Sequence, residues 1–282
     1  MQGLFPTHDI FLERCKMSGK DILELDLSSM NLSLIPYQVF GLSKLQLLNL
    51  QNNHLQEIHE EVFKLKILEV LNLADNILDQ FPYELTHVSF LKNLNLKGNL
   101  IYELPDVIER FTHLKGLNLS SNRLSFIESG LGKLKELENL ILWKNDLVTL
   151  PDDIVHTRIK FLDVSKNSIK ELPLFFRGMK YLRIMKLSEN SLWYLPEDLT
   201  NLSLIELVAN GNQLATLPQE IGSMKKLRRM ILYNNQLEKL PSTITRLKLT
   251  ELDLRGNENL EISRDQLRWI DSLIKSGSRI LL

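Results

Sequence analysis

The chain has 282 residues, and its 34 basic and 35 acidic side chains give a formal net charge of −1. This balance argues against a nucleic-acid-binding or membrane-surface protein, because such proteins need a strong excess of basic side chains. Leucine alone accounts for 61 residues, a bias that usually reflects a repeated structural unit.

Residues 1–21 precede the repeats and are expected to form an N-terminal cap. A short amphipathic helix is predicted over 7–19, ending at Gly19 and carrying Cys15 among its apolar residues. Because the sequence contains one cysteine, no internal disulfide can form and no oxidising compartment is required. The first residues also lack the charged and apolar regions of a signal peptide. The compartment stays open: cytoplasmic, or secreted or surface-exposed if a signal was removed.

One pattern, L-x-x-L-x-L-x-x-N, recurs along most of the chain at intervals of 22 or 23 residues. A fixed period in this range identifies a solenoid of stacked repeats, in which each unit buries its apolar face against its neighbours. We place eleven repeats over residues 22–262. They begin at Ile22, Leu45, Leu68, Leu91, Leu114, Leu137, Ile159, Leu182, Leu204, Leu227 and Leu249.

The ninth position of the repeat is asparagine in ten of the eleven units, and Met30 takes it in the first. The chain must turn where each strand ends, so backbone N–H and C=O groups become enclosed there. An asparagine side chain carries both a donor and an acceptor and can satisfy such groups in adjacent repeats. We therefore predict a structural ladder, and not a catalytic row, made of Asn53, Asn76, Asn99, Asn122, Asn145, Asn167, Asn190, Asn212, Asn235 and Asn257.

Proline occupies the fifteenth position in eight repeats, often with an acid two residues later, as at Glu84 and Glu220. Since proline suits the first helical position and acids suit the first turn, short helices or 3-10 segments are expected opposite the strands. The prolines are Pro36, Pro82, Pro105, Pro151, Pro173, Pro196, Pro218 and Pro241.

Residues 263–282 are expected to close the C-terminal end with a cap helix and tail. Ser263 and Gln266 have the spacing of a capping box, an apolar stripe follows, and Gly277 ends the predicted helix. Residues 280–282 are expected to fold back as part of this cap. Because no linker is evident, residues 1–282 are predicted to form a single domain. The stripe consists of Leu267, Ile270, Leu273 and Ile274, with Trp269 beside it.

The repeats resemble those of leucine-rich-repeat proteins with a 23-residue LxxLxLxxNxLxxLPxxI unit, best matched at residues 91–108 and 227–244. They are similar to the arrays of pathogenic spirochaetes and to intracellular scaffolds of the Ras-signalling and cell-polarity type. The resemblance implies an α/β leucine-rich-repeat solenoid of horseshoe shape. It also implies a concave parallel β-sheet, short helical or 3-10 convex segments and helical caps at both ends. For function, the resemblance implies the binding of other proteins.

Function is expected on the concave face, where the third, fifth and seventh positions of each repeat point outward. Repeats two to five present a polar strip there, with Asn49, Asn72, Asn95 and Asn118 at the fifth position. Repeats six to ten carry apolar and aromatic side chains rimmed by cations, a composition typical of a protein-binding hot spot. The alternative is that these side chains pack on their neighbours as ordinary surface residues. The candidate partner-binding residues are Ile141, Trp143, Lys144, Phe161, Ile184, Lys186, Val208, Arg229, Ile231 and Tyr233.

Two further aromatic residues, Trp193 and Tyr194, lie just past the concave edge of repeat eight. They either extend the candidate surface or shield the loop that follows the strand. No other constellation in the sequence predicts chemistry. The six histidines have no metal-ligand spacing, Cys15 has no partner base, and no glycine-rich phosphate loop is present. Neither a metal nor a cofactor is expected.

The favoured interpretation is a non-enzymatic, monomeric recognition module that binds a protein partner on its concave face. That partner would be a host protein if the source is a bacterial pathogen. Binding to nucleic acid and insertion into a membrane are not expected. Two alternatives stay open: an intracellular signalling scaffold of the Ras or polarity type, and a structural array without a specific partner.

Overall fold

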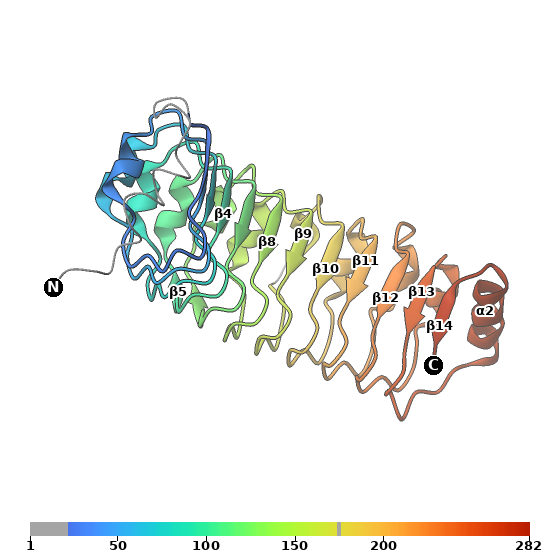
Figure 1. Ribbon diagram of the computed structural model, residues 1–282. Coiled ribbons are helices and arrows are strands. Elements are labelled where there is room, and N and C mark those ends of the chain that lie inside the picture. Colours follow the sequence, from blue (N-terminus) through green and yellow to red (C-terminus); the bar gives the residue numbers. More distant parts are fainter. Residues whose placement is uncertain (1–21, 174–175) are drawn as a thin grey trace. The chain divides into compact units, whose positions relative to one another are not determined.

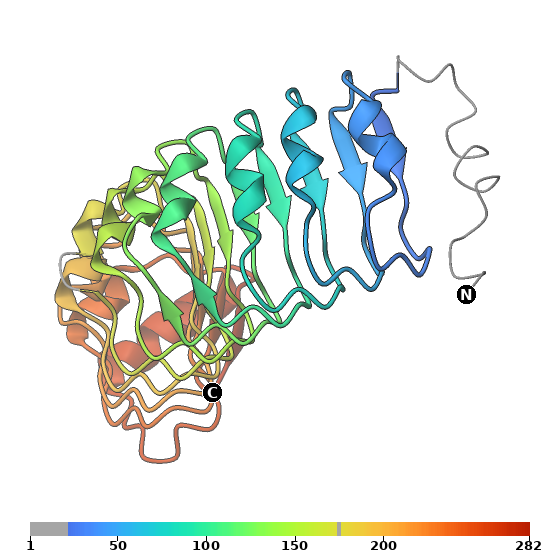
Figure 2. The same ribbon diagram turned by 90° about the vertical axis from the view of Figure 1, so that its left-hand side faces the viewer.

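The computed structural model describes residues 22–173 and 176–282, in which strands line one side of the repeats and short 3-10 helices the other (Figures 1 and 2). Within these residues, twelve parallel strands follow the chain order in one sheet. The chain divides into two compact units, residues 1–139 (unit 1) and 140–282 (unit 2). The expected N-terminal cap, with its helix over 7–19 and Cys15, lies outside the described residues.

Unit 1 contains five three-residue strands of the sheet, paired in parallel between successive repeats. In register, Leu25 lies beside Leu48, which lies beside Leu71. These leucines take the fourth position of their repeats and are fully buried, while their neighbours in the strand face outward. A separate two-stranded sheet pairs β5 with β7. The strands are β1 (Glu24–Asp26), β2 (Leu47–Asn49), β3 (Val70–Asn72), β4 (Asn93–Asn95), β5 (Glu103–Leu104), β6 (Gly116–Asn118) and β7 (Phe126–Ile127).

Unit 2 repeats the same arrangement. Met185 lies between Leu162 and Leu207 on the buried side of the sheet, and all three side chains are inaccessible to solvent. The strands are β8 (Asn139–Ile141), which spans the division between the units, β9 (Phe161–Asp163), β10 (Ile184–Lys186), β11 (Glu206–Val208), β12 (Arg229–Ile231), β13 (Glu251–Asp253) and β14 (Arg279–Leu281).

Proline takes the position before the helix in most repeats, one residue earlier than expected. In the first repeat, Pro36 is the N-cap of a 3-10 helix, and its carbonyl accepts the Val39 N–H at 3.0 Å. Proline has no N–H to lose there, and its φ suits the turn. The 3-10 helices are η1 (Tyr37–Gly41), η2 (Glu60–Lys64), η3 (Tyr83–His87), η4 (Asp106–Arg110), η5 (Leu131–Lys133), η6 (Asp152–His156), η7 (Phe176–Gly178), η8 (Glu197–Asn201), η9 (Ile221–Ser223) and η10 (Ser242–Arg246).

The asparagine ladder bonds each repeat to the one before it. Asn190 shows the pattern: its Oδ1 accepts the Ile169 N–H at 3.0 Å, and its Nδ2 donates to the Val164 and Leu187 carbonyls, both at 3.0 Å. Ile169 and Val164 belong to the preceding repeat, whereas Leu187 belongs to the same repeat as Asn190. The side chain therefore satisfies two carbonyls and one N–H that would otherwise be buried without partners.

The eighth position has a left-handed backbone in every repeat, which the sequence pattern did not indicate. All eleven residues have φ between 52° and 68°. At Gly98 a Cβ would lie 2.3 Å from Asp75 Oδ1 of the previous repeat, so any larger residue there would have to displace the Asp75 side chain. Other residues at this position accept the unfavourable conformation. They are Ser29, Asn52, Asp75, Ser121, Lys144, Lys166, Glu189 and Asn234, with glycine at Gly98, Gly211 and Gly256.

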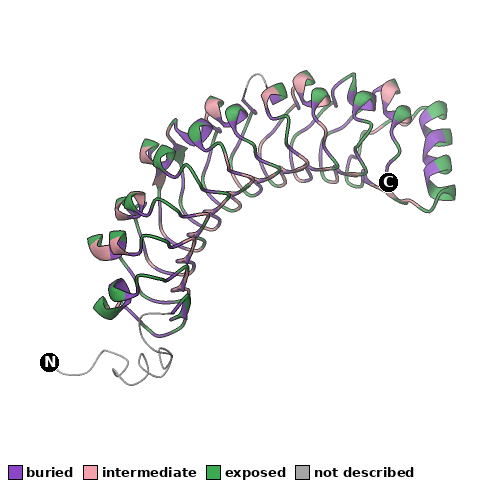
Figure 3. Ribbon diagram, turned by 90° about the horizontal axis from the view of Figure 1, so that it is seen from above, coloured by how far each residue is buried: buried purple, intermediate pink, exposed green. Residues whose placement is uncertain are grey.

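The C-terminal helix, α2 (Arg264–Lys275), begins with the expected capping box between Ser263 and Gln266. The expected stripe is half right: Ile270 and Leu273 are buried, whereas Leu267 and Ile274 are exposed. Buried and exposed stretches alternate along this helix in Figure 3. Trp269 is buried instead of lying beside the stripe, and its Nε1 donates to the Leu247 carbonyl at 2.9 Å. Gln266 also donates to a carbonyl, that of Leu240, at 2.8 Å. The helix is therefore rotated so that Trp269 and Gln266 face the carbonyls of a preceding repeat.

The residues after α2 add a strand to the sheet. Gly277, with φ of 88°, follows the helix, and β14 then pairs in parallel with β13, with Ile280 beside Leu252. The Leu254 N–H donates to the Leu281 carbonyl at 2.8 Å. The tail therefore gives the last repeat the neighbouring backbone that every other repeat obtains from the next repeat.

Replacing Asn190 by alanine should lower the free energy of unfolding by about 1–3 kcal/mol, because three buried backbone groups lose their partner. Chemical denaturation measures this loss. Asn201→Ala is the matched control, since Asn201 is exposed and makes one bond, to the Asp198 carbonyl at 3.3 Å. Equal stability of the two variants would contradict the role given to the ladder.

Replacing Trp269 by alanine should destabilise unit 2 by about 3–5 kcal/mol, the usual cost of removing a buried aromatic side chain. Leu267→Ala, on the exposed side of α2 where 46% of the residue is accessible, should cost about 0.5 kcal/mol or less. Thermal unfolding of both variants shows which side of α2 is buried against the repeats. A larger loss for Leu267→Ala would restore the stripe expected from the sequence.

Candidate protein-binding surface

The candidate residues lie on the open face of unit 2, which is the side of the sheet opposite the buried leucines. Strand pairing sets their order across this face. Phe161 in β9 lies beside Ile184 in β10, and Val208 in β11 lies beside Ile231 in β12. The apolar residues thus form two pairs on neighbouring strands instead of one continuous row.

Val208 and Ile231 point outward from the sheet and yet are buried, with 9% and 5% of their surface accessible. The expectation that they expose apolar surface to a partner is therefore wrong. Both are short β-branched side chains, and the longer side chains of Arg229 and Tyr233 flank Ile231 two residues away on the same face. The position of a residue in the repeat predicts the direction of its side chain, but it does not predict how far the neighbouring side chains extend and cover it.

Trp143 lies between two lysine side chains. The Nζ atoms of Lys144 and Lys166 are 5.9 and 5.5 Å from the centre of its ring. Both lysines occupy the left-handed eighth position of their repeats. The Trp143 side chain is half-buried, so part of the ring stays open to solvent. A cation over an indole ring contributes about 0.5–1 kcal/mol at an exposed site.

Phe161 has a similar arrangement on the neighbouring strands. Lys186 Nζ lies 5.4 Å from the centre of the Phe161 ring, and Ile184 packs beside it in register. All three side chains are half-buried. Among the residues that the structure describes, no ion pair involves Lys144 or Lys186.

Arg229 belongs to a chain of ion pairs that the sequence analysis missed. Its Nη1 lies 2.6 Å from Glu206 Oε1, and its Nε lies 2.6 Å from Glu251 Oε2. Arg279 in β14 adds a contact of 3.1 Å to Glu251. The hydrogen bond to Glu251, with Glu206 on the other side, raises the pKa of the Arg229 guanidinium. Arg229 is therefore already paired within unit 2.

A second ion pair joins Asp253 to Arg255. Arg255 Nη2 donates to Asp253 Oδ2 at 2.6 Å, and the Asp253 side chain is almost fully buried. The hydrogen bond from Arg255 lowers the pKa of the Asp253 carboxyl. Glu206, Arg229 and Glu251 take the third position of successive repeats, so a column-by-column comparison of charges could have found the first chain of ion pairs, whereas Asp253 and Arg255 lie two residues apart in one repeat.

Tyr233 lies far from Trp143 on the same face. Four strand steps separate β8 from β12, which corresponds to roughly 19 Å at about 4.8 Å per step. The two aromatic side chains therefore cannot contact one side chain of a partner together. Trp193 and Tyr194, beyond the strand of repeat eight, pack against each other with ring centres 4.4 Å apart. Trp193 nevertheless stays 59% exposed.

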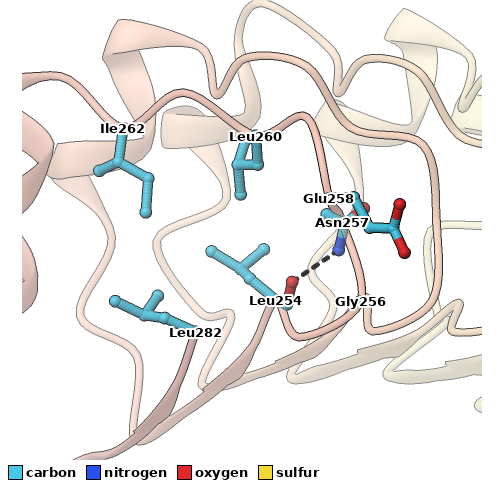
Figure 4. Close-up of a pocket in the computed structure, with 7 residues that line it drawn as sticks. All are labelled: Leu254, Gly256, Asn257, Glu258, Leu260, Ile262 and Leu282. Atoms are coloured by element: carbon cyan, nitrogen blue, oxygen red, sulfur yellow. Dashed lines mark hydrogen bonds between the residues drawn. The ribbon is translucent and has the colours of Figure 1, made fainter.

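A hollow of about 230 Å³ lies near the C-terminal end of unit 2 (Figure 4). Leu254, Leu260, Ile262 and Leu282 supply most of its lining, together with the backbone around Gly256. The Asn257 side chain is held by the Leu254 carbonyl at 2.7 Å and is not free to bind a ligand. The hollow is smaller than the usual ligand pocket of 300–1,000 Å³ and carries one acid, Glu258.

Within residues 22–173 and 176–282, no three histidine, cysteine or acidic side chains are grouped so that they could hold a metal ion. The histidines of this part make local contacts, such as that of His113 with Glu136 Oε1 at 3.3 Å. None of the described helices combines the length and the apolar character needed to cross a bilayer.

The fold is similar to that of a leucine-rich-repeat protein of Leptospira interrogans, with a TM-score of 0.79. The two sequences are 32% identical, and the match covers 93% of this chain and 73% of the other. The chain belongs to the leucine-rich-repeat family. Residues 43–101 and 113–134 also match two leucine-rich-repeat family profiles. The predicted α/β leucine-rich-repeat fold and the similarity to spirochaete members of the family are thereby confirmed.

Two further solved structures have a similar fold. The Arabidopsis receptor kinase HAESA, in complex with a peptide hormone and a co-receptor, is 25% identical with a TM-score of 0.65, over 86% of this chain and 52% of that one. An internalin of Listeria monocytogenes is 18% identical with a TM-score of 0.72, over 92% and 80%. At that identity the likeness shows the fold alone. No curated protein sequence matches the chain.

Replacing Asp253 by asparagine should flatten the dependence of stability on pH in the acidic range. The folded-state pKa lies below the ordinary value of about 3.9, so the charged form stabilises the fold. That stabilisation is present above about pH 4 and is lost as the pH falls through the lower folded-state pKa. Denaturant titrations between about pH 2 and 6 measure it.

Asp265→Asn is the control, because the Asp265 side chain is 83% exposed in its pair with Arg268. It should leave the acidic slope close to that of the parent. Parallel pH curves for the parent and the Asp253 variant would show that the pair with Arg255 contributes nothing.

Proposed function

We propose that the chain is a non-enzymatic recognition module that binds a protein partner on the open face of unit 2. One observation carries this proposal: Trp143, Phe161 and Ile184 keep accessible apolar surface although the interior is already filled by the leucines behind them. Aromatic and aliphatic surface flanked by cations is the composition of energetically dominant contact sites. A partner would remove this surface from water.

Membership of the leucine-rich-repeat family supports binding as the general role. HAESA, a member with similar architecture, was captured with a peptide hormone and a co-receptor. The wide sheet face of such repeats suits an extended segment or a protein surface better than a small molecule. Trp143, Phe161, Ile184 and Tyr233 are the proposed contact residues, whereas Val208 and Ile231 are buried and are left out of this set.

The similarity to the Leptospira interrogans protein favours a bacterial protein that meets a host partner. It favours this setting over an intracellular signalling scaffold. We propose further that the chain acts as a monomer, with the open face left free for the partner. Pull-downs from host and bacterial lysates, compared between the parent and the Trp143→Ala chain, discriminate the two settings.

The combined replacement Trp143→Ala and Tyr233→Ala should weaken binding by about 2 kcal/mol or more per contact residue. It should change thermal unfolding little, because both side chains lie outside the leucine core. Titration calorimetry with the captured partner and thermal unfolding of the variant measure the two effects separately.

The matched control is Asn72→Ala with Asn95→Ala, on the polar face of unit 1, which should reduce binding less. A Trp143/Tyr233 variant that unfolds several degrees earlier but binds with parental affinity would sink the proposal. The aromatic side chains would then be packing residues, and the partner would bind elsewhere.

A further inference from the structure

The open face of unit 2 carries two different charge environments. Between residues 140 and 189, bases outnumber acids by three when the margins of the open face, the second and eighth positions of the repeats, are counted with its outward-facing positions. From residue 204 onward, each outward acid is paired with an arginine within the unit. The first set consists of the bases Lys144, Lys160, Lys166, Arg183 and Lys186 and the acids Asp163 and Glu189.

The arginine half is already neutralised. Arg229 contacts Glu206 and Glu251, and Arg255 contacts Asp253, with N to O distances of 2.6 Å in all three pairs. A carboxylate arriving from a partner would have to compete with these charge-assisted hydrogen bonds. The arginines at the outward-facing positions of this half are therefore already paired, and Arg228 at its margin bonds backbone carbonyls.

The lysine half differs because its cations lie over rings. Lys144 and Lys166 flank Trp143, and Lys186 lies over Phe161. Lys166 also lies 3.6 Å from Glu189, a pair whose side chains are 43% and 55% exposed. Exposed pairs of this kind contribute little to stability, so Lys166 can exchange Glu189 for a carboxylate of a partner.

The backbone at Lys144 and Lys166 adds a second observation. Both residues hold φ near 55–58° in the turn after the strand, a conformation that three other repeats give to glycine. A left-handed backbone is unfavourable for a residue other than glycine. Because the fold imposes this conformation on the eighth position of every repeat, it also sets the place of these two side chains. Here it places two ammonium groups beside one indole ring.

The two aromatic-lysine groups lie at opposite ends of their strands. Trp143 takes the seventh position of its repeat, and Phe161 takes the third position of the next. Four residues along a strand and one step across the sheet separate them by roughly 14 Å. An extended peptide covers that length in about four residues. Asp163 lies between the groups and disfavours a carboxylate at the middle of such a peptide.

We propose that the lysine half of the open face binds an acidic segment of the protein partner. Two carboxylates about four residues apart would meet Lys186 at one end and Lys144 with Lys166 at the other. Apolar side chains of the same segment would cover Trp143 and Phe161. This inference rests on the proposed function and specifies the chemistry of its partner.

Lysines interleaved with aromatic rings also suit single-stranded nucleic acid, which stacks its bases on such rings. Two observations favour the peptide. The acids Asp163 and Glu189 lie among the lysines and would repel a continuous phosphate backbone, and the chain as a whole has no basic excess. An acidic peptide can place its carboxylates only where lysines stand.

A displayed library of random 12-residue peptides, selected on the immobilised full chain, tests the proposal. Selected peptides should be enriched in aspartate and glutamate next to aromatic or aliphatic residues, relative to the unselected library. The dissociation constants of synthetic copies, measured by fluorescence anisotropy, should rise about tenfold or more in a Lys144→Gln, Lys166→Gln, Lys186→Gln chain. They should also rise with ionic strength, because the pairs lie at the surface.

The control removes three lysines of unit 2 that lie outside the open face, Lys225, Lys226 and Lys248, also by glutamine. It changes the net charge equally and should alter the dissociation constants less than about twofold. Thermal unfolding of both triple variants verifies that they are folded. An equal loss of affinity in the control would overturn the proposal, because net charge alone would explain the binding.

Two other outcomes separate this inference from the function on which it rests. In the first outcome, the selected peptides are neutral or basic, and their binding is lost in the Trp143→Ala, Tyr233→Ala chain. This result would overturn the preference for acidic peptides but would still support the recognition surface of the proposed function. Peptides that bind that double variant with parental affinity would overturn both. Tighter binding of a single-stranded DNA oligonucleotide than of the selected peptides would overturn the acidic-peptide assignment in favour of nucleic acid.

Discussion

The whole arrangement depends on satisfying the backbone groups that become enclosed where each strand ends. An unpaired N–H or C=O buried there would cost about 1–3 kcal/mol in every repeat. One asparagine side chain per repeat answers three such groups, as Asn190 does for Ile169, Val164 and Leu187. The leucines can then fill the interior with apolar atoms alone. The interior needs no contribution from outward side chains such as Trp143 and Phe161, which can therefore form a recognition surface.

The same turn links the interior to that surface. To bring the asparagine inward at the ninth position, the residue before it adopts a left-handed conformation throughout the array. Some repeats use glycine, and others use asparagine, which tolerates this conformation. Lys144 and Lys166 are unfavourable choices for the backbone, and their ammonium groups stand beside Trp143. A requirement of the fold thus fixes where charged groups border the open face.

The sequence could predict those structural features that recur in every repeat. The period located the strands, the ladder and the 3-10 segments, because each depends on contacts that recur between equivalent positions. It failed where neighbours in space decide the outcome. The burial of Val208 and Ile231 depends on the heights of adjacent side chains, and the pairing of Arg229 depends on which charges meet across strands. On α2 the apolar pattern favoured Leu267, whereas hydrogen bonds from Gln266 and Trp269 to the last repeats set the rotation of the helix.

The ladder also has a direction along the chain. Each asparagine completes the turn of the repeat before it, so Met30 can occupy the ladder position of the first repeat while Asn53 accepts its N–H at 3.0 Å. During synthesis, which proceeds from the N-terminus, a finished repeat waits for the next asparagine to emerge. The growing chain therefore always ends in one incompletely bonded turn, and at the end of the array α2 and β14 bond the last repeats through Gln266, Trp269 and the Leu281 carbonyl. Folding on the ribosome would follow translation one repeat behind.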